Sequence, residues 1–145
     1  MRLAVLPAFG AQRCWTVEYG SAHREPVRAE LAICDTSSDF DRFLAMPADA
    51  QAAMVPIVTR SAYDVDQPTL ARIETLLGSA SVPIVIRDPP RGTDGVSYRL
   101  EVRDAFNSMS LRWWHRGPRN WAAVPVCFQQ VWAILNGLAG IIDVR

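Results

Sequence analysis

Lysine is absent from this chain: all 15 basic residues are arginine, balanced by 15 acidic residues. Without lysine, a nucleotide-binding P-loop, which holds phosphate with a lysine, is excluded. The formal net charge of zero argues against a nucleic-acid binder, because contacts with phosphates need an excess of cations. Arginine suits bidentate and stacked contacts at a binding surface, but a genome rich in G and C would also favour arginine codons. The sequence leaves both interpretations open.

Histidine and cysteine are scarce. His23 and His115 are the only histidines and lie far apart in the sequence, without the clustered ligands that a metal site needs. Cys14, Cys34 and Cys127 form no C-x-x-C pair, and an odd number argues against a disulfide framework. We therefore expect three free thiols, no metal and no cofactor.

Long hydrophobic runs are also missing. The stretch from Trp132 to Ile142 is interrupted by a polar residue and two glycines, and is far shorter than the ~20 apolar residues that a membrane span needs. Near the N-terminus, Pro7 and Arg13 interrupt a run that would otherwise resemble a secretory signal. These features predict a cytoplasmic protein that does not associate with membranes.

A length of 145 residues, with 50% hydrophobic and 21% charged residues, is typical of one globular domain, which we expect to span residues 1–145. No repeat, low-complexity tract or linker divides the chain.

Alternating apolar and polar residues predict the strands. In the first expected hairpin, Trp15 lies opposite Leu31 and all apolar residues share one face. We expect an edge strand at Leu3–Phe9, because Pro7 cannot donate a ladder hydrogen bond. The other predicted strands are Arg13–Tyr19, Val27–Cys34, Val82–Arg87, Val96–Asp104 and Met109–Arg116.

Capping residues and a period of three to four residues predict the helices. The first is capped by Thr36, Ser37 and Ser38, with an apolar face of Phe40, Phe43 and Leu44. The other predicted helices are a short one from Pro47 to Met54, Gln67–Gly78 capped by Asp66, and Arg119–Asn136, broken or kinked near Pro125. This order of elements predicts an α+β fold, a mainly antiparallel sheet with helices covering one face.

The last hairpin carries the most distinctive stretch, Ser110–Trp121, which contains three tryptophans and three arginines. Pairing Val102 with Leu111 would place Trp113 in the core and Trp114 on the opposite face. That face would hold Arg99, Arg103, Arg112, Trp114 and Arg116. Two interpretations of Trp114 stay open: arginine stems cover its ring, or the cluster is a hot spot for a protein partner.

The same region supports a resemblance. The pattern Asp94-Gly-x-x-Tyr-x-Leu, followed by Leu111-x-Trp-Trp-x-x-x-Pro-x-x-Trp121, resembles one in small uncharacterised bacterial proteins, some of them encoded beside toxins. The resemblance covers about 45 residues and is carried by a motif of low specificity. It implies an interaction role like that of an immunity protein, and it brings no active site with it.

An acidic cluster, Asp35, Asp39 and Asp41, lacks the glycine turn and terminal glutamate of a calcium loop. It is better explained as the negatively charged first turn of a capped helix.

Two functional hypotheses follow. The first is a non-catalytic module that binds a protein, such as a toxin with an acidic surface, by occlusion. The second is a small enzyme or ligand-binding domain whose pocket joins His23 or His115 to Asp64 or Asp66. The sequence contains no motif for nucleophilic catalysis, which favours the first hypothesis. The oligomeric state is not indicated.

Overall fold

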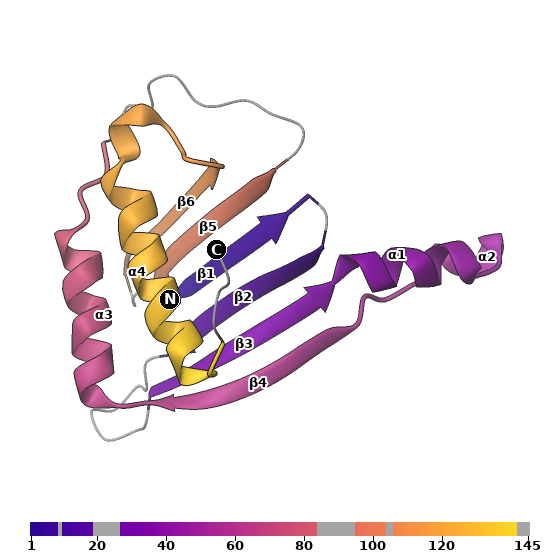
Figure 1. Ribbon diagram of the computed structural model, residues 1–145, viewed down its shortest axis with the longest axis horizontal. Coiled ribbons are helices and arrows are strands. Elements are labelled where there is room, and N and C mark those ends of the chain that lie inside the picture. The colour runs from indigo at the N-terminus through magenta and orange to yellow at the C-terminus, as the bar shows by residue number, and fades with distance from the viewer. Residues whose placement is uncertain (9, 19–26, 84–94, 104–105, 142–145) are drawn as a thin grey trace.

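The computed structural model describes the chain except residues 9, 19–26, 84–94, 104–105 and 142–145. Its centre is one six-stranded antiparallel sheet with the strand order β4-β3-β2-β1-β5-β6 (Figure 1). The strands are β1 (Arg2–Pro7), β2 (Ala11–Glu18), β3 (Val27–Asp35), β4 (Val58–Val65), β5 (Val96–Arg103) and β6 (Ser108–Trp114). The helices are α1 (Thr36–Ala45), α2 (Ala48–Gln51), α3 (Gln67–Ser79) and α4 (Ala123–Leu138), with a 3₁₀ turn at Arg119–Trp121. The predicted α+β class is confirmed.

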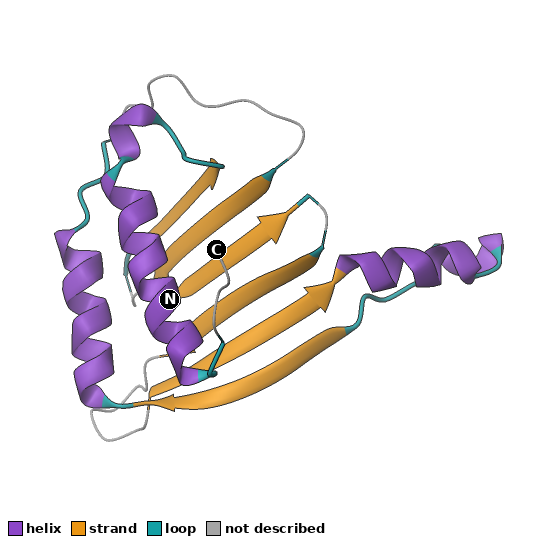
Figure 2. Cartoon of the chain, in the orientation of Figure 1, coloured by secondary structure: helices purple, strands orange, loops and turns teal. Residues whose placement is uncertain are grey.

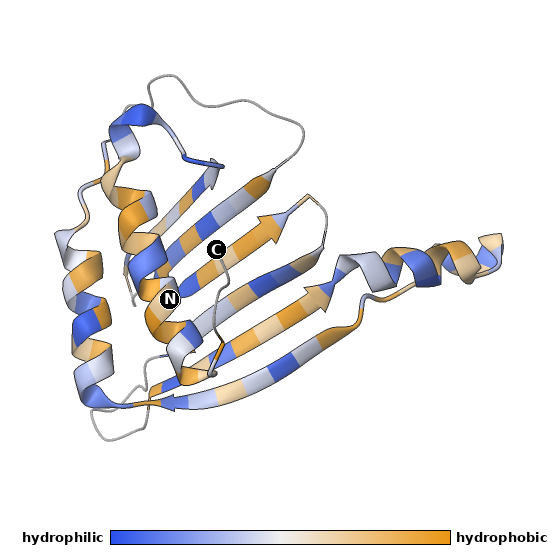
Figure 3. Ribbon diagram, in the orientation of Figure 1, coloured by the Kyte–Doolittle hydropathy of each residue, from blue (hydrophilic) through white to orange (hydrophobic). Residues whose placement is uncertain are grey.

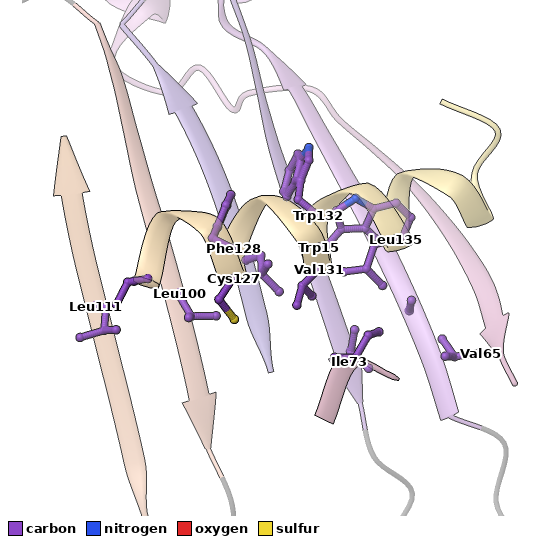
Figure 4. Packing of buried hydrophobic residues seen from close by; sticks show 14 of the residues in the cluster. Trp15, Val65, Ile73, Leu100, Leu111, Cys127, Phe128, Val131, Trp132 and Leu135 are labelled. Carbon is purple, nitrogen blue, oxygen red and sulfur yellow. The ribbon is translucent and has the colours of Figure 1, made fainter. Parts of the chain in front are cut away.

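Helices α3 and α4 lie together on one face of the sheet (Figure 2). Leu3, Trp15 and Leu100 on the sheet are buried, as are Phe128 and Leu135 on α4. Figure 4 shows these side chains of α4 directed between the helix and the strands. Burial of apolar side chains in a core of this kind supplies the main stabilisation of the fold.

The first predicted hairpin is confirmed, with Trp15 opposite Leu31 and Val17 opposite Ala29. Register is well specified here, because a slip by one residue would expose every apolar side chain of the hairpin.

The predicted position of the first strand is wrong. β1 is a central strand, paired with β2 on one side and β5 on the other. Pro7 is tolerated because it is the last residue of β1, so the N–H that it lacks removes no hydrogen bond from the interior of the strand. The next residue, Ala8, donates its backbone N–H to the carbonyl oxygen of Gly95, which precedes β5, at 2.8 Å.

The strand β4 was not predicted from the sequence. Its residues from Val58 to Ala62 are all exposed, so the apolar alternation that identifies a half-buried strand is missing. Conversely, Val82 and Pro83 are not in a strand, and the remainder of the strand predicted at Val82–Arg87 lies outside the described residues.

The predicted register of the last hairpin is wrong by two residues. Leu100 pairs with Leu111 and Tyr98 pairs with Trp113, in the register that places Arg103 opposite Ser108. A slip of two residues keeps every side chain on its predicted face. Trp113 is accordingly buried and stacks on Tyr98, with ring centroids 5.6 Å apart.

Two of the helix predictions hold in detail. The Asp66 carboxylate accepts a hydrogen bond from Thr69 N at 2.9 Å and caps α3. The predicted break separates the 3₁₀ turn from α4, and Pro125 lies in the first turn of α4. Backbone N–H groups in the first turn have no acceptor within the helix, so the N–H that proline lacks costs no hydrogen bond there.

The first helix differs from expectation. Its cap is Asp35, whose carboxylate accepts hydrogen bonds from the backbone N–H groups of Ser37 and Ser38. Its predicted apolar face is not part of the core: Phe40 is 59% exposed and Leu44 is 63% exposed. The reason is tertiary, since α1 and α2 form an arm that projects past the end of β3 and β4 (Figure 3).

Asp39 is the structural anchor of this arm. The carboxylate is buried, accepts a hydrogen bond from Arg42 Nη1 at 2.6 Å and also accepts the backbone N–H of Ile57. With Asp35 capping the helix, two of the three clustered aspartates have structural roles. No group of three or more residues suited to binding a metal ion occurs in the described part of the chain.

Candidate partner-binding surface

The face of the sheet opposite α3 and α4 is open, since no described helix lies over it (Figure 2). An antiparallel sheet can leave one face in water when its outward side chains are polar. Alternation along the paired strands places these charged residues on the open face: Arg2, Glu18, Arg28, Glu30, Arg60, Asp64, Arg99, Glu101, Arg103 and Arg112.

Three of the predicted site residues are brought together on this face. Arg99 lies directly opposite Arg112, and Trp114 follows two residues later on the same side of β6. Two like charges opposite each other are unfavourable in a sheet. An ion pair between Arg99 Nη2 and Glu101 Oε1, at 2.5 Å, offsets the repulsion. Arg112 has no ion-pair partner among the described residues, so its guanidinium is available to another molecule.

The other two predicted residues lie apart from this group. Arg103 is at the far end of β5, opposite Ser108. Arg116 is not on a strand, because β6 ends at Trp114 and His115 has a positive φ of 51°. The chain turns at this point, so strand alternation does not define the direction of Arg116.

Trp114 does not pair with Arg99, as the predicted register required, but lies opposite Ser97. Its indole packs against Gly95, where an added Cβ would come within 2.9 Å of Trp114 Cζ2. The side chain is half-buried in consequence. The absence of a side chain at Gly95 therefore makes room for part of the indole ring, and the remainder of the ring is exposed beside Arg112.

A shallow groove of about 300 Å³ lies in the middle of the open face and was not predicted from the sequence. Its floor is made of small side chains from adjacent strands, Ala4, Cys14 and Ala32, between Arg60 and Arg99. Alternation alone assigns Cys14 and Ala32 to the polar face. Placing them next to Ala4, and between two arginines, requires the strand order.

Arg2 also lines the groove. Its Nε donates a hydrogen bond to Cys14 Sγ at 3.0 Å, and this contact raises the pKa of Arg2 above its ordinary value. Arg60 is held by an ion pair with Glu30. The guanidinium groups of Arg2 and Arg60 are thus held in place around the groove. The small side chains of its floor leave room for a side chain of a partner.

The residues of the alternative hypothesis are not brought together. His115 follows β6 and Asp64 lies on β4, which are the two opposite edges of the sheet. Asp64 faces Arg28, with Oδ1 3.9 Å from Nε, and Asp66 caps α3, which lowers its pKa through hydrogen bonds with Thr69. His23 lies outside the described residues.

All three cysteines are free, as predicted. Burial raises the pKa of Cys127, and burial together with a hydrogen bond to Asp39 raises the pKa of Cys34. A raised pKa disfavours the thiolate, which is the nucleophilic form. These two thiols are therefore poor candidates for nucleophilic catalysis.

Among the described helices, none is both long and apolar enough to cross a membrane. Comparison of the chain with protein-family models, curated proteins and solved structures found no match.

Proposed function

We propose that this protein is a non-catalytic module that binds an acidic protein partner through the open face of its sheet. The observation that carries the proposal is the concentration of arginine on that face. Arg2, Arg60, Arg99 and Arg112 surround or adjoin the groove, although the chain as a whole has a net charge of zero. Glu30 and Glu101 pair with Arg60 and Arg99, but the open face as a whole carries six arginines against four carboxylates and so has a local excess of positive charge.

Such a surface would act in two ways. The local positive potential would steer a partner with clustered carboxylates, and the association rate would fall as salt is added. Trp114 and Arg112 would then anchor the complex, since tryptophan and arginine are the residue types most enriched in binding hot spots.

The resemblance of the C-terminal hairpin to proteins encoded beside toxins gives the proposal its specific form. We propose that the partner is a bacterial toxin and that the protein neutralises it as immunity proteins do, by covering its surface in the cytoplasm. This role needs charge and shape complementarity and no catalytic group, which fits the separation of His115 from Asp64 and Asp66.

The test is a titration of the purified chain against the product of the neighbouring gene. Replacing both Arg112 and Trp114 by alanine should weaken binding about 30-fold or more, which corresponds to about 2 kcal/mol. Arg72→Ala is the matched control, because Arg72 is an exposed arginine on α3, away from the open face. Equal affinity of the double variant and the control, with both folded by circular dichroism, would refute the proposed surface.

A further inference from the structure

The edge strand β4 has features that its neighbours lack. It pairs only with β3, and Figure 1 shows no described element beyond it, so one row of its backbone N–H and C=O groups has no sheet partner. It is eight residues long, contains no proline and is exposed from Val58 to Ala62. An edge of this kind is a template for pairing with another strand.

We propose that a second copy of this chain pairs with β4, strand to strand and antiparallel, about a two-fold axis at Ala62. The two sheets would then form one continuous sheet. The contact is isologous, as in most homodimers, since each β4 presents the same surface to the other. This dimer uses the backbone edge of β4, whereas the proposed toxin binding uses the open face and is anchored by Arg112 and Trp114 on the opposite edge strand; Arg60 is the residue common to both.

The charges of β4 match this arrangement. Arg60 and Asp64 lie two residues on either side of Ala62 and on the same face of the strand. Antiparallel pairing about Ala62 therefore brings Arg60 of each copy directly opposite Asp64 of the other. Opposite charges in cross-strand positions are favourable, and the two-fold axis makes the pair twice.

Existing contacts would extend these pairs into a network. Arg60 already contacts Glu30 on β3, and Asp64 already faces Arg28. In the dimer, charges of alternating sign would cross the junction in the order Glu30, Arg60, Asp64, Arg28, the last two from the second copy.

Other registers match less well. An axis at Ser61 pairs Arg60 with Ala62 and Asp64 with Val58, and an axis at Arg60 brings the two arginines together. The axis at Ala62 leaves only small side chains where the copies are closest. It also pairs seven residues of each β4, Thr59 to Val65, and places no like charges opposite each other.

The segment that leads from α2 into β4 adds apolar surface at both ends of the same contact. Ile57 and Val58, immediately before the paired residues, are 58% and 42% exposed, and Val55 is 75% exposed. Contiguous exposed apolar residues of this size are typical of interaction sites. The other edge strand, β6, lacks a self-complementary charge pair, because Arg112 is its only charged residue.

The first measurement is the molar mass of the purified chain in solution, by light scattering or sedimentation over a range of concentrations. We expect a reversible dimer. The second measurement tests the register through Ala62→Cys. The two Cα atoms at position 62 would be about 4.5–5.5 Å apart, which a disulfide can span. Mild oxidation should therefore cross-link this variant as a covalent dimer.

Thr59→Cys is the matched control, on the same strand and equally exposed. Its two copies would lie about 20 Å apart, six residues along the strand direction, and should not cross-link. The unaltered chain, with its three native cysteines, should also stay uncross-linked. A chain that is monomeric at every concentration, or a dimer in which Ala62→Cys cross-links no better than Thr59→Cys, would overturn the proposal.

The charge pair has its own test. Asp64→Arg places two arginines opposite each other and should weaken dimerisation about tenfold or more, whereas Glu74→Arg, the same change on exposed α3, should not. Equal weakening by both variants would contradict the register. Because these experiments need no other protein, their failure is distinguishable from failure of the proposed toxin binding.

Discussion

Replacing Trp113 by alanine should destabilise the protein far more than replacing its neighbour Trp114. The Trp113 side chain is 5% exposed, stacks on Tyr98 and meets Phe128 edge-on, with ring centroids 5.2 Å apart. Its pyrrole edge also contacts the turn, since a Cβ on Gly117 would lie 3.2 Å from Trp113 Cδ1. Removing the indole would therefore leave a cavity lined by these groups.

The magnitude follows from the buried area. A buried tryptophan removes about 150–250 Å² from water, which at ~25 cal/mol per Å² is worth about 4–6 kcal/mol. Large-to-small substitutions of aromatic core residues cost about 3–5 kcal/mol, and we expect Trp113→Ala to lie in this range. Trp114 is half-buried against Gly95, and solvent can fill the space that it leaves, so we expect about 1–2 kcal/mol for Trp114→Ala.

Thermal and denaturant unfolding followed by circular dichroism would measure the difference. In a chain of this length, the Trp113→Ala variant should melt about 10 °C or more below the parent, and Trp114→Ala about 3–7 °C below it. Equal losses of stability would refute the assignment of the two faces of β6, and with it the position of Trp114 on the open face.

Two further predictions concern single contacts. Asn136→Leu should cost about 1–3 kcal/mol of unfolding free energy in a denaturant titration, because Asn136 Oδ1 accepts the buried Trp15 Nε1–H at 3.0 Å and leucine would leave that donor unsatisfied. A variant as stable as the parent would contradict this. Gly95→Ala should destabilise the fold and displace Trp114, since the backbone has φ +143° and the new Cβ would clash with the indole. Unchanged near-ultraviolet circular dichroism and melting temperature would show that the ring is not seated on Gly95.

Local pattern in the sequence determined much of the fold. Alternation placed Trp15 and Leu31 on the same buried face, because any odd slip would expose the apolar side chains, but it did not exclude the even slip found in the last hairpin. The side chain of Asp66 and the following Pro68 defined the start of α3, since both act through their nearest backbone neighbours. The faces of Trp113 and Trp114 were also predictable, because adjacent strand residues point in opposite directions.

Tertiary structure decided the rest. Which strand is central cannot be read from alternation, so Pro7 suggested an edge although β1 is in the middle of the sheet. The apolar face predicted for α1 does form, but a sequence pattern does not say which element will cover such a face, and Phe40, Phe43 and Leu44 are all exposed. The groove required Ala4, Cys14 and Ala32 from three separate strands to become neighbours. The residues of the groove become neighbours only because β1, β2 and β3 lie side by side. That strand order depends on long-range packing, which no local sequence pattern records.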